Sequence, residues 1–156
     1  MTGARNRAGT ITVTAGSFHR LRRKVLSIRD EVFVRGMGVP LEIEHDSRDR
    51  DCLQVLVEVD GVPAATGRLD AGMDGKVGRV AVLSCFRGMG LGTRVMTELE
   101  RAALRKDIQS LWCHAQLTAV EFYLGLGWRR TGPEFMEAGI EHVRMEKDLK
   151  GASRGG

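Results

Sequence analysis

The chain has 156 residues, of which 42% are hydrophobic and 28% charged, and its 24 basic and 20 acidic side chains give a formal net charge of +4. This length suits one domain with its own core, and the composition argues against a disordered protein. No apolar run reaches the roughly 20 residues of a membrane span, and residues 1–10 lack the apolar segment of a secretory signal. We therefore expect a cytoplasmic protein with no membrane partner.

The first half of the chain predicts a strand, a helix and a hairpin. Residues 10–14 alternate in polarity, as in a strand. A helix with one apolar stripe follows, because apolar residues recur at three- and four-residue steps: Phe18, Leu21, Val25, Ile28 and Val32. Gly36 and Pro40 end it. Residues 41–51 are acidic and irregular, and residues 52–59 and 63–69 predict two strands joined at Asp60-Gly61.

The other face of that first helix is basic, with Arg20, Arg22, Arg23, Lys24 and Arg29. One interpretation is a solvated face; the other is that some of these arginines meet a phosphate-bearing ligand or an acidic partner. A nucleic-acid surface is the weakest interpretation, because acidic residues are interleaved and no aromatic stacking platform is present. We expect no nucleic-acid partner.

The second half predicts strand and helix units. Residues 76–83 and 110–116 are expected to be strands that flank a helix from Leu91 to Arg105. Thr118 and Glu121 form a capping-box pattern that begins a short helix ending at Gly125 or Gly127. Residues 128–132 and 140–149 complete the strands. Together these elements predict one α/β domain over residues 10–150, with helices on both faces of the sheet and flexible ends at 1–9 and 151–156.

The most informative stretch is Arg87-Gly88-Met89-Gly90-Leu91-Gly92-Thr93, between a predicted strand and a predicted helix. Alternate glycines leave backbone N–H groups uncovered, and the helix start adds unpaired N–H groups and a positive dipole end. Such a turn binds an anion, most naturally a pyrophosphate. The glycine spacing differs from the dinucleotide pattern G-x-G-x-x-G, and no Lys-Ser/Thr pair makes a nucleotide-triphosphate loop.

With a second motif, this loop resembles the GNAT superfamily of acetyl-CoA-dependent N-acetyltransferases. The second motif consists of Ala115-Gln116, Ala119, Phe122-Tyr123 and Leu126-Gly127-Trp128. More narrowly, the chain resembles the ElaA-like branch, for example at Ala65-Thr66-Gly67-Arg68-Leu69 and Gly139-Ile140-Glu141-His142. Gly36 and Met37 stand where that branch tends to show Glu-Gln. If that pair lines the acceptor pocket, there are two alternatives: substrate choice here differs from that branch, or activity is reduced.

The resemblance implies a mixed, mainly antiparallel sheet of six or seven strands that splays open between residues 77–83 and 110–116. It also implies that acetyl-CoA is the co-substrate. The implied cofactor-binding residues are Ala81, Val82, Leu83, Arg87, Gly88, Met89, Gly90, Leu91, Gly92, Thr93 and Gln116. Main-chain amides of the loop would hold the pyrophosphate, and the edge of the strand would pair with the pantetheine arm. An N–H near Val82 would bond the thioester carbonyl.

The resemblance also implies that Tyr123 protonates the departing thiolate, although a half-buried structural aromatic is the alternative. An attacking amine must first lose a proton, and the candidate bases are His142, Glu44 and His114. His114 is equally explained as a packed core residue. Glu44 and Asp46 are also explained as binding a cationic substrate or capping a loop.

The three cysteines, Cys52, Cys85 and Cys113, are odd in number and far apart, so we expect buried, reduced thiols rather than disulfides. No His or Cys set has metal-ligand spacing, and we predict no metal. Ser84-Cys85 lacks a nucleophile elbow, which favours direct transfer in a ternary complex.

We therefore predict an N-acetyltransferase that acts on a primary amine of a small molecule or peptide. The alternative is a non-catalytic acyl-CoA-binding regulatory module, which would share every cofactor contact. The sequence leaves the acceptor and the oligomeric state, including a homodimer, open.

Overall fold

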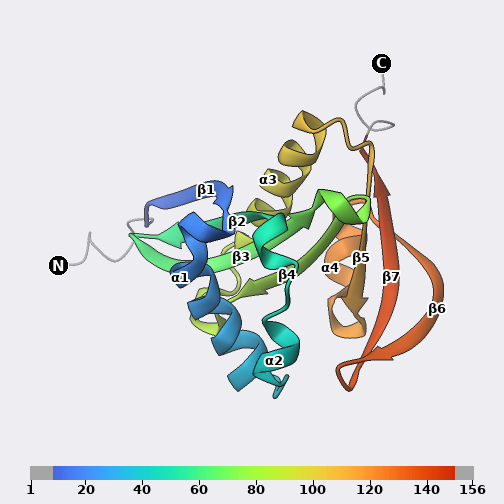
Figure 1. Cartoon of the computed structure of the whole chain (residues 1–156), viewed down its shortest axis with the longest axis horizontal. Helices are drawn as coiled ribbons and strands as arrows, with labels where there is room; N and C mark the ends of the chain where they lie inside the picture. Colours follow the sequence, from blue (N-terminus) through green and yellow to red (C-terminus); the bar gives the residue numbers. More distant parts are fainter. Residues whose placement is uncertain (1–8, 150–156) are drawn as a thin grey trace.

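The computed structural model describes residues 9–149, and the predicted flexible ends lie almost wholly outside that range. One seven-stranded sheet runs in the order β1-β2-β3-β4-β5-β7-β6 (Figure 1). Its strands are β1 (Ile11–Ser17), β2 (Leu53–Val59), β3 (Val62–Asp70), β4 (Lys76–Val82), β5 (Ser110–Gln116), β6 (Arg129–Glu137) and β7 (Ile140–Asp148). All neighbours are antiparallel except β4 and β5. This is the mixed, mainly antiparallel sheet that the resemblance implied, and with its helices it makes an α+β fold.

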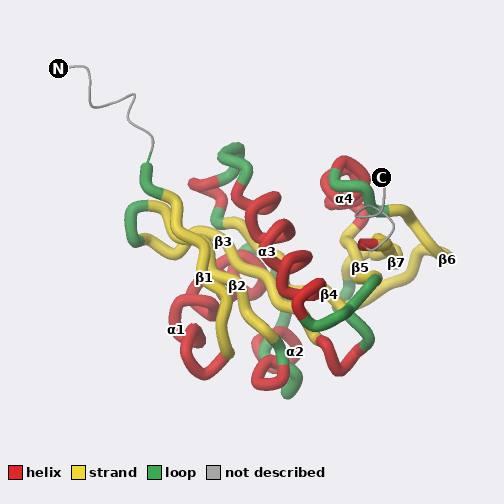
Figure 2. The backbone as a smooth tube through the Cα atoms, turned by 90° about the horizontal axis from the view of Figure 1, so that it is seen from above, coloured by secondary structure: helices red, strands yellow, loops and turns green. Residues whose placement is uncertain are grey.

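Helices cover both faces of the sheet (Figure 2). They are α1 (Phe18–Arg29), α2 (Leu41–Glu44), α3 (Leu91–Arg105) and α4 (Val120–Gly125). The apolar stripe of α1 packs with Leu56 on one face, whereas α3 packs with Val55 and Val57 on the other, in a core cluster that also includes residues of α4. Alternate residues of β2 thus serve two cores, as the two-residue period of a strand requires. Gly67 lets α3 approach β3 closely, because a Cβ there would lie 2.6 Å from a methyl group of Val95.

The sheet opens between β4 and β5. Within the described chain these parallel strands pair only at Lys76 and Trp112, so the rest of β4 has a free edge on this side. A bulge in β4 lies beside the opening, where Arg79 and Val80 stand opposite Gly67 and Arg79 takes a left-handed φ of 52°. A bulge bends and twists its strand, which turns β4 away from β5. The predicted splay is therefore present.

Several sequence expectations were wrong in detail. Helix α4 does not begin at the predicted capping box. It starts after Ala119 with no side-chain cap, and Thr118 belongs to a preceding 3-10 turn, Leu117–Ala119. Strand β6 continues to Glu137, because Gly132 and Pro133 form an irregularity in the ladder rather than its end. Cys85 is exposed, since β4 stops at Val82 and Cys85 lies in a loop turn.

The start of the chain also differs from expectation in two places. The first helix ends at Gly36 as predicted, but its last residues, Asp30–Arg35, form a π-helical turn rather than α-helix. The acidic segment 41–51 contains α2 and a 3-10 turn, Asp49–Asp51, rather than irregular backbone alone. Among residues 9–149, no helix is both long and apolar enough to cross a membrane.

Candidate active site

A cavity of about 610 Å³ occupies the opening between β4 and β5. One wall comes from the π-helical turn, α2 and the segment between them, with Phe33, Ile43 and Met37 respectively lying in the turn, in α2 and in that segment. The opposite wall comes from β5 and the β6–β7 hairpin, with His114 and His142. The remaining lining includes the following predicted site residues: Glu44, Ala81, Val82, Arg87, Gly92, Gln116 and Tyr123. Residues far apart in the sequence therefore surround one space.

The glycine loop forms a main-chain cradle at the start of α3. Gly88 and Gly90 have φ values of 84° and 75°, and a Cβ at either position would meet nothing within 4 Å. Arg94 N–H donates to Gly90 C=O as the first helical bond, so the N–H groups of Leu91 to Thr93 have no acceptor within the helix. Bare amides, open space and the nearby Arg87 guanidinium fit an anionic phosphate group. Met89 lies in the same loop.

The end of β4 offers a main-chain donor to the opening. The N–H of Leu83 donates to the carbonyl of Ala64 on β3 at 2.9 Å, which makes Leu83 and Ala64 a hydrogen-bonded pair. Because N–H groups of successive strand residues point to opposite edges, the N–H of Val82 is directed away from β3. It therefore faces the free edge of β4, where an extended ligand chain can add as a further strand.

Tyr123 lies at the buried end of the cavity wall formed by α4. Its side chain is 7% exposed and packs edge to face against Phe122 and Trp128, with ring centroids 5.2 and 5.3 Å away. Burial, together with neighbouring Cys113, raises the pKa of the Tyr123 hydroxyl. The phenol is therefore protonated at neutral pH, as a proton donor must be, while its ring is also part of the core.

Glu44 is engaged in a buried ion-pair network. Its carboxylate accepts from Nε and Nη2 of Arg29, at 2.8 and 3.1 Å, and lies 3.3 Å from Nε of Arg79. Arg29 also binds Asp49 and is fully buried, which contradicts its assignment to a solvated face. Both carboxylate oxygens of Glu44 are occupied by Arg29 and one also lies beside Arg79, so the carboxylate has no free oxygen to offer to a substrate amine.

Asp46 belongs to the same network. Its oxygens accept from both terminal nitrogens of Arg68, at 2.8 and 2.7 Å, and from Arg79 at 3.1 Å. Burial alone would raise the pKa of Asp46, but the hydrogen bond and charge of Arg68 outweigh it and lower the pKa to about 2. Asp46 therefore fixes the loop after α2 to the sheet.

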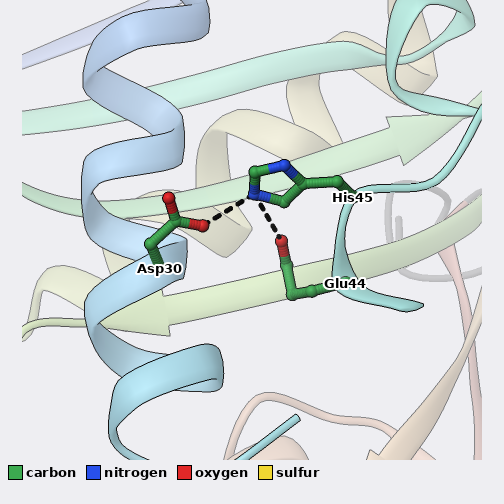
Figure 3. Close-up of side chains that lie close together, drawn as sticks. All are labelled: Asp30, Glu44 and His45. Atoms are coloured by element: carbon green, nitrogen blue, oxygen red, sulfur yellow. Dashed lines mark hydrogen bonds and ion pairs between the residues drawn. The ribbon is translucent and has the colours of Figure 1, made fainter. Parts of the chain in front are cut away.

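Asp30, Glu44 and His45 bring possible metal-ligand atoms within 4.8 Å of one another (Figure 3). Nε2 of His45 lies 2.7 Å from Asp30 and 3.6 Å from Glu44. The Glu44 carboxylate is already paired with Arg29 and Arg79, so two positive charges lie beside the three possible metal ligands. Little negative charge is left for a cation, and the arrangement is better described as an ion-pair cluster.

His142 presents a defined ring nitrogen. Nδ1 lies 2.7 Å from the carbonyl oxygen of Ile140, which can only accept, so Nδ1 carries the proton. In the neutral ring, Nε2 then has a free lone pair. The side chain stacks on Phe135 and is 8% exposed.

His114 has a partner that sequence reasoning missed. Its Nδ1 lies 2.8 Å from Oε1 of Glu137, and both residues line the cavity. Burial lowers the pKa of His114, partly offset by Glu137, so the ring is neutral at pH 7 with Nε2 unprotonated. No sequence spacing indicated this pair, because Glu137 was expected to lie beyond the end of its strand.

Gln116 and Met37 meet across the opening. Nε2 of Gln116 donates to Sδ of Met37 at 3.4 Å, which links β5 to the segment before α2. The sequence left open whether the Gly36-Met37 pair lines the acceptor pocket. Met37 lines the cavity, whereas Gly36 is not among the lining residues.

Comparison with known proteins yields one consistent result. A family model described as "Acetyltransferase (GNAT) domain" matches residues 30–149. The chain is 38% identical over 124 residues to a Bacillus subtilis (strain 168) protein named "Putative acetyltransferase BSU40680", covering 77% of this chain and 84% of that protein.

Solved structures agree. A crystal structure described as a "putative N-acetyltransferase" from Lactobacillus plantarum superposes with a TM-score of 0.83 at 28% identity, covering 90% of this chain and 99% of that one. Escherichia coli ElaA superposes with a TM-score of 0.77 at 21% identity, covering 89% of this chain and all of that one. ElaA is thus one structural neighbour among several, and its likeness concerns the fold.

Proposed function

Because the chain belongs to the GNAT acetyltransferase family, we propose that it transfers an acetyl group from acetyl-CoA to a primary amine of a small molecule or peptide. Family membership implies the use of an acyl-CoA. The observation that carries the proposal is a single cavity that is lined by Arg87 and Gly92 of the phosphate cradle, by the free edge of β4 and by a buried tyrosine, Tyr123. A cytoplasmic location is part of the proposal on sequence grounds.

The residues of the chain divide into binding and chemical roles. Amides of the loop from Gly88 to Thr93, with Arg87, hold the diphosphate. The free edge of β4 at Ala81 to Leu83 positions the pantetheine arm, and Gln116 closes the opposite side. The Val82 N–H stabilises the carbonyl oxygen that gains negative charge during attack.

Proton transfer is assigned to two cavity residues. Tyr123 donates its hydroxyl proton to the leaving sulfur. His142 accepts a proton from the attacking nitrogen through Nε2, whose lone pair is free because Nδ1–H is bonded to Ile140. Glu44 is not assigned as the base, since Arg29 and Arg79 hold its carboxylate.

The proposal is tested by measuring CoA release from acetyl-CoA against a panel of amines, amino acids and peptides. We expect turnover with at least one primary amine, and acetyl-CoA itself should raise the melting temperature by mass action. Stabilisation by acetyl-CoA without turnover on any acceptor would favour the regulatory-module alternative. If acetyl-CoA neither stabilised the protein nor was turned over, both the acetyltransferase and the regulatory-module proposals would be refuted.

A further inference from the structure

Two protons must leave a primary ammonium when it becomes an amide, and one general base accounts for only one of them. A free alkylamine has a pKa of about 10.4, so it enters the cavity as R–NH₃⁺ at neutral pH. The first proton must be lost before attack, because only the neutral nitrogen has a lone pair. The second is lost once the new N–C bond forms.

Two histidines line the cavity, and their surroundings differ. His142 is 8% exposed and its Nδ1–H is bonded to a main-chain carbonyl, which has no net charge. The His114 side chain is 29% exposed and its Nδ1–H is bonded to a carboxylate, Glu137, that is itself 42% exposed. His114 therefore has a charged partner and an open route to solvent.

On these grounds we propose that His114, oriented by Glu137, removes the first proton from the ammonium of the acceptor and passes it to solvent. This inference rests on the proposed function. Glu137 is a positioning residue, since it acts through His114. Its carboxylate fixes the tautomer with Nε2 unprotonated and stabilises the imidazolium that forms.

The atoms and charges balance over the whole reaction. One proton passes from R–NH₃⁺ to Nε2 of His114 and then to water. The freed nitrogen lone pair forms the N–C bond, the C–S bond breaks, and the sulfur takes the hydroxyl proton of Tyr123. The second nitrogen proton passes to His142 and returns to Tyr123. The products are an amide, a thiol and one released proton.

The charged and titratable groups around His114 come from three strands. Glu137 on β6 favours the imidazolium, whereas Lys76 on β4 and His142 on β7 disfavour it. Arg144 on β7 stands opposite His114 in the ladder and lies over the Trp112 ring. Glu137 is thus the anionic group in direct contact with the ring, and removing it should lower the pKa of His114.

The test compares His114→Gln and Glu137→Gln with wild type. For each protein, kcat/KM is measured as a function of pH with an alkylamine that wild type acetylates. We expect His114→Gln to lose about 100-fold at pH 7 and to recover as pH approaches the pKa of the amine, where the acceptor arrives neutral. Glu137→Gln should lose about 10-fold and shift the acidic limb to lower pH by roughly half to one unit. Glu134→Gln removes a surface carboxylate on the same strand, paired with Arg130, and should match wild type.

A second acceptor separates proton removal from structural damage. With a weakly basic amine, whose pKa lies below the assay pH, both variants should approach wild-type kcat/KM. If His114→Gln fails to fold, the comparison of the two amines with Glu137→Gln alone still distinguishes lost proton removal from structural damage. Equal losses with both amines, or no recovery at high pH, would overturn the inference while the proposed function stands. No turnover by wild type with any amine would instead refute the proposed function.

Discussion

The proposed function gives Tyr123 a catalytic role beside its packing role, and a single substitution can separate the two. Its ring fills the core between Phe122 and Trp128, while its hydroxyl is the only part available for proton donation. Tyr123→Phe keeps the ring and removes the proton. We expect kcat to fall about 100-fold, in the range typical of lost general acid catalysis, with acetyl-CoA affinity within about twofold of wild type. Steady-state kinetics and titration calorimetry measure the two quantities.

An unchanged kcat in Tyr123→Phe would assign the tyrosine to packing alone. Because burial raises the pKa of this hydroxyl, we also expect no loss of activity from its ionisation across the neutral range. A basic limb that disappears in Tyr123→Phe and has a midpoint near pH 8 would contradict that expectation.

Phe33, Met37 and Ile43 make one wall of the cavity apolar, and we propose that the acceptor binds against this wall, here called the acceptor wall. The nearby carboxylate of Glu44 is already paired, so a second positive charge on the acceptor finds no free partner there. We expect wild type to prefer amines with an apolar body over diamines. Met37→Glu should shift the kcat/KM ratio toward diamines by up to about fivefold, since one exposed ion pair contributes at most about 1 kcal/mol. Met136→Glu, at an exposed position outside the cavity lining, is the matched control.

At the residue scale, the sequence located part of the site well. Tyr123, His142 and Gln116 were identified from motifs and all line the cavity. Glu137 and the burial of Arg29 were missed, because each depends on a partner from a distant segment: His114 across 23 residues and Glu44 across 15. Periodicity reports which face of a helix is apolar, and it cannot report an ion pair formed inside the fold.

At the element scale, the turn between β4 and α3 requires glycine for its backbone shape. Gly90 is the N-cap of α3 with φ near 75°, a region that costs an alanine roughly 1–2 kcal/mol. We expect Gly90→Ala to weaken acetyl-CoA binding about 10-fold and to lower stability modestly, as measured by calorimetry and thermal unfolding. Gly125→Ala is the control, because its φ is not positive and a Cβ there meets nothing within 4 Å. Equal binding by both variants would argue against the cradle.

The elements themselves were predicted with uneven accuracy for a physical reason. The bounds of α3 and β5 were predicted to the residue, because each shows one clear hydrophobic period, three to four residues in α3 and two in β5. The predicted start of α4 was wrong, because Thr118, which resembles a helix cap, belongs to a 3-10 turn. The predicted length of β6 was wrong, because Gly132 and Pro133, which resemble a strand end, form an irregularity within the ladder. Tertiary pairing decided these cases.

At the scale of the whole molecule, one ionic network holds the acceptor wall to the sheet. Arg29 on α1 binds Glu44 at the end of α2 and Asp49 in the following turn, while Arg68 on β3 binds Asp46 and Asp49. Removal of one partner would leave an uncompensated buried charge, which is costly. The position of the wall that faces the substrate therefore depends on charges that the substrate does not contact.

This network predicts how stability depends on acid. The pKa of Asp46 is lowered to about 2 from an ordinary 3.8, and that of Asp49 is also lowered, because Arg68 and Arg29 outweigh burial. A carboxylate with a depressed folded-state pKa contributes fully above its unfolded pKa and loses that contribution as pH falls through the folded value. We expect the free energy of unfolding to fall between about pH 4 and pH 2, with about 1–2 kcal/mol of the loss due to Asp46.

Urea unfolding at a series of pH values measures this dependence. Asp46→Asn should be less stable than wild type above pH 4, and the difference should shrink as pH falls toward 2. Glu31→Gln, which removes the exposed pair with Arg35, should differ little from wild type throughout. If the gap between Asp46→Asn and wild type stayed constant with pH, the aspartate would be acting through shape or hydrogen bonding alone. The arginine-held carboxylates would then not be what fixes the acceptor wall in place.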